Sequence, residues 1–369
     1  MAGKSLTLLA VGDIALQQPD GQSFFSLAAP VLKTGDVVVG QGEVVFTSRG
    51  YSTFVGMVHT ATSCPPGNIG ALAYAGFNVI TLAGNHIWDS GAPGIEDTIA
   101  GLRSLGITPV GAGMNIDEAR KPAIIERDGT RIGFLDYNCV GPIGSWATPA
   151  KPGGAFVHII THYEIKSANP GGAPDIYTFA ETDSLNEMAE DVKKLRPLCD
   201  VLVVVFHKGG DSGNREKLAM YDKQVSYAAI DAGADLILGH HAHVLKGIEV
   251  YKGKVIFHGL GDFVPAYAVE DEGQRKAHRF LSTYSSTVPP ADSDPVTKRT
   301  IIAKCIIKDG KISQVGYLPC YMNEKKQPEV FKKDERGQEV FDFVKKITMG
   351  AGLNTEYKWK GNEVVIRQS

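Results

Sequence analysis

Several strands of this chain are apolar almost throughout and end abruptly in polar residues. The run FNVITLA at 77–83 shows the pattern, and DVLVVVF at 200–206 and ADLILG at 234–239 repeat it. Such strands are typical of parallel sheets that helices cover on both faces. Segments with helical spacing lie between them, as in PPGNIGALAYAG at 65–76, which begins with prolines and ends at a glycine. The alternation predicts a layered α/β fold.

Three predicted hairpins interrupt this alternation. Two of them turn at Asp128–Gly129 and Lys252–Gly253, and the third spans 301–319. We expect further strands at 6–11 and 37–40, and further helices at about 94–106, 183–197, 217–232 and 336–347. Together these elements predict a sandwich of sheets flanked by helices. We expect a single domain over 1–369, with a short C-terminal helical extension at about 331–369.

Composition argues against several classes of protein. The 369 residues carry a formal charge of −3, whereas a protein that binds mainly nucleic acid needs a strongly basic surface. The N-terminal apolar run leads into Gly-Asp rather than into the cleavage site of a secretory signal. No segment approaches the ~18 apolar residues of a membrane helix. The five cysteines form no CxxC pair, which favours reduced thiols in the cytoplasm. Oligomeric state stays open, homo-oligomers included.

Potential metal ligands follow six of the predicted strands. In open α/β sheets, ligand sites assemble at the carboxyl ends of the strands. Side chains that follow different strands can therefore meet at one place. The residues with this placement are Asp13, Glu43, Asn85, His86, His207, His240, His241, His243 and Asp262.

The mixture of residue types indicates the kind of metal. Imidazoles and carboxylates without nearby cysteine suit Zn, Mn or Fe rather than a structural zinc knot or a calcium cage. The donors suffice for one or two divalent ions, and a pair ~3.5–4 Å apart is a common hydrolytic centre. Taken singly, Asp13 could cap a helix, Glu43 could be a solvated carboxylate and His207 a core histidine. Their shared position after strands favours the metal site.

The stretch TLAGNHIWD at 81–89 predicts a catalytic pair beside the metals. Asn85 offers an amide oxygen as a ligand. His86 then lies next to the metals and can protonate a leaving group. If a helix begins here, Asp89 lies on the same face three residues later and can orient His86 through its other ring nitrogen.

The order of these motifs resembles a known family. GDIAL, GQGEVVFT, AGNHIWDSG, FHKGG, GHHAHVLKGIEVYKGKVIFHGLGDF and YLPCYMNEKKQPEV are similar to the poly-γ-glutamate capsule biosynthesis protein CapA family, over about residues 5 to 330. That family is similar in turn to the calcineurin-like binuclear metallophosphoesterases, which implies a four-layer αββα sandwich. The resemblance implies that Glu43 bridges the metals and that the other ligands are Asp13, Asn85, His207, His241 and His243.

Three positions depart from the pattern of these families. Ala15 stands where metallophosphoesterases have a histidine, which implies that one metal site is either weak or completed by a different residue. Asp262 stands where the capsule family has an amide, and its carboxylate could serve as an additional ligand or as an outer partner. His240 is an extra histidine, which replaces His241 as a ligand if the register shifts by one residue.

The resemblance and the residues together predict a soluble metal-dependent hydrolase. In this interpretation a metal-bound hydroxide attacks an amide, γ-glutamyl-like or cyclic, or a related carbonyl bond. The alternatives are a metallophosphoesterase acting on a phosphoester and a non-catalytic accessory protein of capsule biosynthesis. The expected partner is a small or oligomeric, polar or anionic substrate, with no nucleic acid and no membrane.

Two long stretches without clear periodicity, about 141–175 and 265–299, are expected to be loop insertions that cover the site. The first follows the predicted strand FLDYN and the second follows GLGDF, and both of these elements lead to or from the proposed metals. Long loops in compact domains are often functional. In the second stretch, Arg279 could bind an acidic substrate in a two-pronged fashion, although QRKAHRF at 274–280 could equally be a solvated helix face. In the first stretch, the candidate pocket walls are Trp146, His162 and Tyr163.

Overall fold

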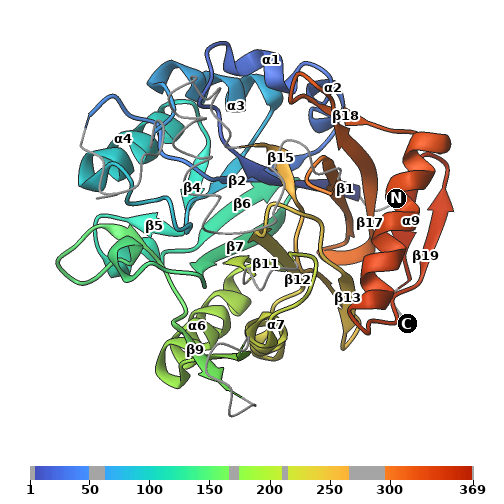
Figure 1. Ribbon diagram of the computed structural model, residues 1–369. Coiled ribbons are helices and arrows are strands. Elements are labelled where there is room, and N and C mark those ends of the chain that lie inside the picture. The colour runs from blue at the N-terminus through green and yellow to red at the C-terminus, as the bar shows by residue number, and fades with distance from the viewer. Residues whose placement is uncertain (1–4, 50–62, 166–173, 210–214, 266–295, 368–369) are drawn as a thin grey trace.

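The computed structural model describes residues 5–49, 63–165, 174–209, 215–265 and 296–367. Within these ranges, two large β-sheets pack face to face and helices cover their outer faces (Figure 1). The protein is therefore a four-layer αββα sandwich, as expected from its sequence.

The first sheet combines a parallel half and an antiparallel half. Its main path runs β19-β20-β17-β16-β1-β2-β3-β4, with β15 paired to β1 and β18 paired to β17. Strands β1 to β4 and β15 are parallel, whereas β16 and β17 form the expected hairpin. The strands are β1 Ser5–Ile14, β2 Val37–Gly42, β3 Val79–Thr81, β4 Thr108–Val110, β15 Asp262–Val264, β16 Arg299–Lys308, β17 Lys311–Met322, β18 Pro328–Val330, β19 Tyr357–Lys360 and β20 Glu363–Ile366.

The second sheet has the order β13-β14-β12-β11-β7-β6. Its four central strands are parallel, and the two predicted hairpins provide its antiparallel edges. The strands are β6 Ala123–Arg127, β7 Thr130–Asn138, β11 Val201–Lys208, β12 Leu236–His241, β13 Ile248–Tyr251 and β14 Lys254–Phe257. The central run of valines in β11 is buried on both faces, as its composition predicts.

Three apolar cores hold the layers together. One lies between the two sheets and includes Leu8 of β1 and Val203 of β11. The other two lie between each sheet and its helices. The helices on the first sheet are α1 Gly21–Phe25, α2 Ala29–Leu32, α3 Gly70–Ala75 and α4 Gly91–Ser104. The helices on the second sheet are α5 Ile116–Ala119, α6 Thr182–Leu195 and α7 Met220–Ala232.

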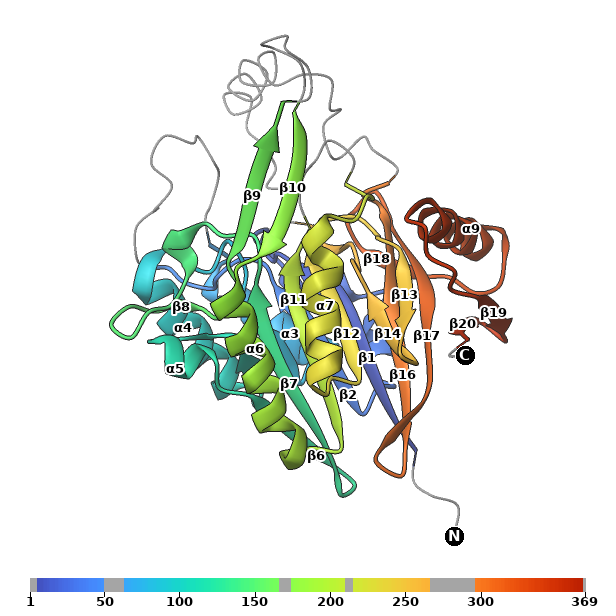
Figure 2. The ribbon, with the colours of Figure 1, turned by 90° about the horizontal axis from the view of Figure 1, so that it is seen from below.

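The first expected insertion, 141–175, and the C-terminal extension contain more structure than their patterns indicate. Part of 141–175 forms β8 Gly153–Gly154, which pairs with β5 Ala112–Gly113, and β9 Ile159–Glu164, which pairs with β10 Asp175–Ala180. The β9–β10 hairpin projects from the body of the molecule (Figure 2). The extension contributes α9 Glu335–Gly350 and also β19 and β20, which join the first sheet. Of 265–299, residues 266–295 lie outside the described residues. In the described part of the chain, no helix is long and apolar enough to cross a membrane.

Candidate metal centre

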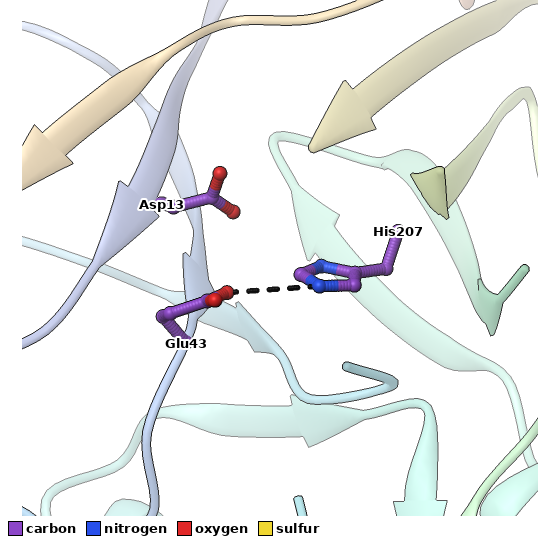
Figure 3. A group of neighbouring side chains, drawn as sticks. All are labelled: Asp13, Glu43 and His207. Carbon is purple, nitrogen blue, oxygen red and sulfur yellow. Dashed lines mark ion pairs between the residues drawn. The ribbon is translucent and has the colours of Figure 1, made fainter. Parts of the chain in front are cut away.

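Three side chains from three strand ends meet between the sheets. Asp13 lies near the end of β1, Glu43 follows β2 directly, and His207 lies near the end of β11. Figure 3 shows the three side chains pointing toward one another, and one ligand atom of each lies within 4.8 Å of the others. All three residues are buried. The sequence-based expectation that strand ends converge here therefore agrees with their placement.

A second group shares Asp13 with the first. Asp13, His243 and Asp262 also place ligand atoms within 4.8 Å of one another. Asp262 reaches this position because β15 pairs in parallel with β1, with Asp262 in register with Asp13. Its Oδ1 lies 2.7 Å from His243 Nδ1. Asp262 thus adds a carboxylate to this cluster, in which residue 15 is an alanine and offers no ligand atom.

Glu43 lies within reach of both groups. Its Oε2 is 3.7 Å from His207 Nε2, and its Oε1 is 3.5 Å from His243 Nε2 and 3.8 Å from His86 Nε2. Two donors that share one ion at bond lengths near ~2.1 Å lie about 3 to 3.5 Å apart. The separations from His207 and His243 are close to this range, so Glu43 is placed where a bridging carboxylate would stand.

The remaining predicted ligands gather around His207. Asn85 Oδ1 is 2.7 Å and His241 Nδ1 is 3.2 Å from His207 Nε2. His240 differs, because its Nε2 lies 3.1 Å from the carbonyl oxygen of Val11. The structure therefore places His241 in the cluster, while His240 is an outer residue that ties β12 to β1.

Four buried carboxylate oxygens of this cluster lack hydrogen-bond donors among the described residues. Among the described residues, Asp13 Oδ1, both Glu43 carboxylate oxygens and Asp262 Oδ2 have no partner. Burial raises the pKa of Asp13 well above its ordinary value, and the neighbouring Glu43 adds to this shift. Burial also raises the pKa of Glu43. Carboxylates are rarely left buried without a compensating charge, so a divalent cation fits this donor set.

The histidines of the cluster divide into two kinds. Burial and the other histidines hold the pKa of His207 well below its ordinary value, and burial lowers the pKa of His241 to about 3. Both are therefore neutral near pH 7, which is the form that binds metal. Burial alone would lower the pKa of His243, but Asp262, Glu43 and Asp13 outweigh it and raise the pKa to about 10. The protonated His243 thus supplies the positive charge that a bound cation would supply instead, and His243 would then be neutral and could bind that cation.

The turn after β12 has an unusual backbone. His241 has a φ of 82° and His243 a φ of 55°, both in the left-handed region that non-glycine residues rarely adopt. The amide of His241 donates to Asp13 Oδ2 at 3.0 Å, which fixes this turn against β1. Residues kept in such conformations cost on the order of 1–3 kcal/mol each and concentrate at functional sites. Here the backbone directs both imidazoles into the cluster.

His86 and Asp89 form the pair expected from the sequence. His86 Nδ1 lies 2.6 Å from Asp89 Oδ2, while Nε2 faces Glu43. Burial lowers the pKa of His86, but the hydrogen bond to Asp89 and the charge of Glu43 outweigh it, so the net shift is upward. A protonated imidazole at the edge of the cluster can donate a proton to a leaving group.

Comparison with known proteins identifies the family of this chain. Residues 7–267 match the family described as bacterial capsule synthesis protein PGA_cap. The chain belongs to this family. It is 29% identical over 272 residues to the capsule biosynthesis protein CapA of Bacillus anthracis, covering 71% of this chain and 60% of that protein. It is 27% identical over 335 residues to the PGA biosynthesis protein CapA of Bacillus subtilis, covering 82% and 80%.

Among solved structures, the NAD nucleotidase of Haemophilus influenzae aligns with 93% of this chain and 63% of its own, with a TM-score of 0.42 and 12% identity. The chain thus spans less than two thirds of the Bacillus anthracis relative and of this nucleotidase.

In this member of the capsule synthesis family, sequence reasoning missed Asp136. Its Oδ2 accepts hydrogen bonds from the amides of Leu82 and Ala83 at 2.9 and 2.7 Å, directly before the loop that carries Asn85. Asp136 therefore fixes the start of the loop. The signal in the sequence was a carboxylate inside the apolar strand GFLDYN. A polar side chain buried on such a strand needs a hydrogen-bond partner.

A buried charge network behind His207 was also missed. Lys208 Nζ donates to Ser226 Oγ at 2.9 Å and lies 2.9 Å from His258 Nδ1. Lys246 Nζ lies 3.4 Å from Asp222 Oδ2, and neither side chain is exposed. Burial alone would raise the pKa of Asp222, but the charges of Lys246 and Lys208 outweigh it and lower the pKa. This network fixes the backbone beside His207.

The proposed pocket walls have mixed placements. Trp146 stacks on Phe156 with ring centroids 4.3 Å apart. Trp146 forms a β-bridge with Gly154. Gly154 packs closely against Ala83, because a Cβ added to Gly154 would lie 3.3 Å from Ala83 Cα. His162 and Tyr163 lie on the projecting hairpin β9, and Tyr163 is 62% exposed. Arg279 lies outside the described residues.

Proposed function

We propose that this protein is a metal-dependent hydrolase that cleaves an amide bond, γ-glutamyl-like or cyclic. The observation that carries the proposal is the placement of Glu43. Both of its oxygens are buried without a hydrogen-bond donor among the described residues, and they lie 3.5–3.8 Å from three imidazoles. The proposed ligands are Asp13, Glu43, Asn85, His207, His241 and His243, with Asp262 as an additional ligand and one or two ions of Zn, Mn or Fe.

Each residue around the ions has a proposed task. Divalent metals bound here would activate a water molecule and polarise the bond under attack. His86 donates a proton from Nε2 to the departing nitrogen. Asp89, bonded to His86 Nδ1, holds the ring in that orientation and stabilises its protonated form. Asp136 and the turn after β12 keep the ligand-bearing loops in place.

Charge favours an amide over a phosphoester as the substrate. Asp13, Glu43 and Asp262 place three carboxylates at one centre. Ala15 occupies the position at which metallophosphoesterases have a histidine, so the resemblance to phosphoesterases is weaker here. A phosphoester brings further negative charge to such a centre, whereas an amide carbonyl is neutral. The Bacillus subtilis relative is named a PGA biosynthesis protein, and this name supports a γ-glutamyl substrate.

Metal analysis combined with parallel assays tests this function. The purified protein should contain about one or two transition-metal ions per chain, in line with the donor set. It should hydrolyse a γ-glutamyl amide or a cyclic amide faster than an aryl phosphodiester. Glu43→Gln keeps the size of the side chain but removes the charge that holds the metals, and it should lose both metal and turnover. Faster cleavage of the phosphodiester would contradict the amide assignment.

A second candidate function is a non-catalytic role in capsule polymer synthesis. The observation that favours it is that both Bacillus relatives are named for biosynthesis rather than hydrolysis. A protein with this role would bind little transition metal, and Glu43→Gln would leave its metal content and its turnover unchanged. Stoichiometric metal together with turnover on any of the three substrates would exclude it.

A further inference from the structure

A cavity of about 220 Å³ adjoins the candidate metal centre. It lies where β15, the start of β16 and the end of β17 come together. Asp262 connects the two places, because it lines the cavity and also contacts His243. The lining residues are Asp262, Pro265, Thr297, Lys298, Met322, Asn323, Glu324 and Lys326. Its volume is below the ~300–1,000 Å³ of pockets for drug-sized ligands, so it suits a group the size of one amino-acid residue.

Lys298 gives this cavity an available positive charge. Its side chain is partly buried, and its carbonyl oxygen accepts a hydrogen bond from Met322 at 2.7 Å, which fixes the backbone. Within the described ranges, its ammonium group has neither a hydrogen bond nor an ion pair. A partly buried ammonium without a partner is a suitable site for an anion.

The cavity wall is held in place before any ligand binds. Asn323 Oδ1 accepts from the amides of Lys325 and Gln327 at 2.9 and 3.0 Å, which fixes the turn that carries Lys326. Thr300 Oγ1 donates to Leu260 O at 2.9 Å and ties β16 to the chain before β15. A preformed wall reduces the conformational entropy lost on binding.

The charges around the cavity favour an anion at its Lys298 side. Lys298 and Lys326 are both partly buried, whereas Glu324 is exposed to water, which screens its charge. Asp262 belongs to the metal cluster, and a bound cation would neutralise it. An anion in the cavity therefore meets lysine on one side and the metal centre on the other.

We propose that this cavity is a carboxylate subsite in which Lys298 binds a free carboxylate of the substrate and so positions the bond to be cleaved beside Asp262. This inference rests on the proposed hydrolase function and deepens it. The substrate class is a small amide with a carboxylate about one residue away from the scissile bond, as in a γ-glutamyl compound.

Binding of glutarate to metal-loaded protein tests the subsite without relying on turnover. Isothermal titration calorimetry should show glutarate binding to the wild type and roughly 10–100-fold weaker binding to Lys298→Met, because a charge-assisted hydrogen bond is lost. Lys298→Arg should retain most of the affinity. Lys325→Met is the matched control, since Lys325 is exposed and does not line the cavity. Lys298→Gln replaces the Met variant if the latter does not fold.

Kinetics on two anilides separate this inference from the proposed function. Lys298→Met should raise KM for γ-glutamyl-p-nitroanilide, with kcat and metal content nearly unchanged, and leave KM for the carboxylate-free butyryl-p-nitroanilide unaltered. If neither anilide is cleaved but glutarate binding still depends on Lys298, the hydrolase proposal fails and the subsite stands. Equal glutarate affinity in wild type and folded Lys298→Met would overturn the subsite. The subsite would also be overturned if Lys298→Met bound inorganic phosphate more weakly than the wild type but bound glutarate equally well.

Discussion

At the residue scale, His86 and His243 face the same Glu43 oxygen but differ in the partner of their other ring nitrogen. His86 Nδ1 contacts Asp89, which lies outside both ligand groups, whereas His243 Nδ1 contacts Asp262, which belongs to one of them. We therefore expect His86→Ala to lower turnover by ~10²–10⁴-fold with metal content nearly unchanged. His243→Ala should lose metal. Metal analysis beside initial rates checks both, and loss of metal in His86→Ala would make His86 a ligand.

Asp136 predicts a pH dependence of stability. Burial raises the pKa of this carboxyl from 3.8 to about 7, despite the hydrogen bonds from Leu82 and Ala83. Between these two values the folded state holds a proton that the unfolded state has released, so the contribution of Asp136 to stability falls as pH rises. The slope is at most about 1.4 kcal/mol per pH unit.

Asp136→Asn should remove this contribution. Urea unfolding of both metal-free proteins at several pH values gives the difference in their free energies of unfolding. That difference should shift in favour of the variant as pH rises from about 4 to about 7, and level off above this range. A difference that stays constant with pH would show that Asp136 is ionised throughout in the folded protein.

At the element scale, the centre depends on how closely β15 approaches β1. A Cβ on Gly12 would lie 1.7 Å from the carbonyl oxygen of Gly261, so any side chain there forces the two strands apart. Gly12→Ala should lower the free energy of unfolding by about 1–3 kcal/mol or more. It should also weaken metal binding, because Asp13 and Asp262 separate. Gly67→Ala is the control, since a Cβ there meets nothing within 4 Å. Metal titration with denaturant unfolding distinguishes them, and equal behaviour of the two variants would refute the close approach.

At the scale of the whole molecule, the C-terminal extension completes the core between the sheets. Val340, Val344 and Ile347 of α9 belong to the same apolar cluster as the central strands. Ile347→Ala should lower the free energy of unfolding by about 2–5 kcal/mol. Met349→Ala on the same helix should change it by less than about 0.5 kcal/mol, because Met349 is 67% exposed. Chemical denaturation with both variants measures the contrast, and a neutral Ile347→Ala would mean that α9 packs only loosely.

The apolar runs of the sequence were sufficient to predict the layered fold and most of its elements. Strands such as 200–206 are hydrophobic on both faces, and only a position between two layers satisfies that pattern. The hairpins at Asp128–Gly129 and Lys252–Gly253 were predictable because their turn residues favour the backbone conformation required there. The placement of polar residues directly after strands was also predictable from the sequence, because it depends only on the local order of residues along the chain.

Tertiary structure alone decided which of these polar residues meet. The alternation of side chains along β12 does not show whether His240 or His241 is the ligand. The positive φ angles of His241 and His243 direct these two imidazoles into the cluster, whereas His240 contacts the carbonyl oxygen of Val11. Asp262 joins Asp13 only because β15 adds to the sheet in register with β1, a pairing between residues far apart in sequence. The proton affinity of Asp136 likewise depends on burial and on the amides of Leu82 and Ala83. The partial burial of Lys298, whose ammonium has no partner among the described residues, also depends on segments far apart in sequence. Sequence order sets the local pattern, whereas contacts between distant segments set the distances and charges on which the chemistry depends.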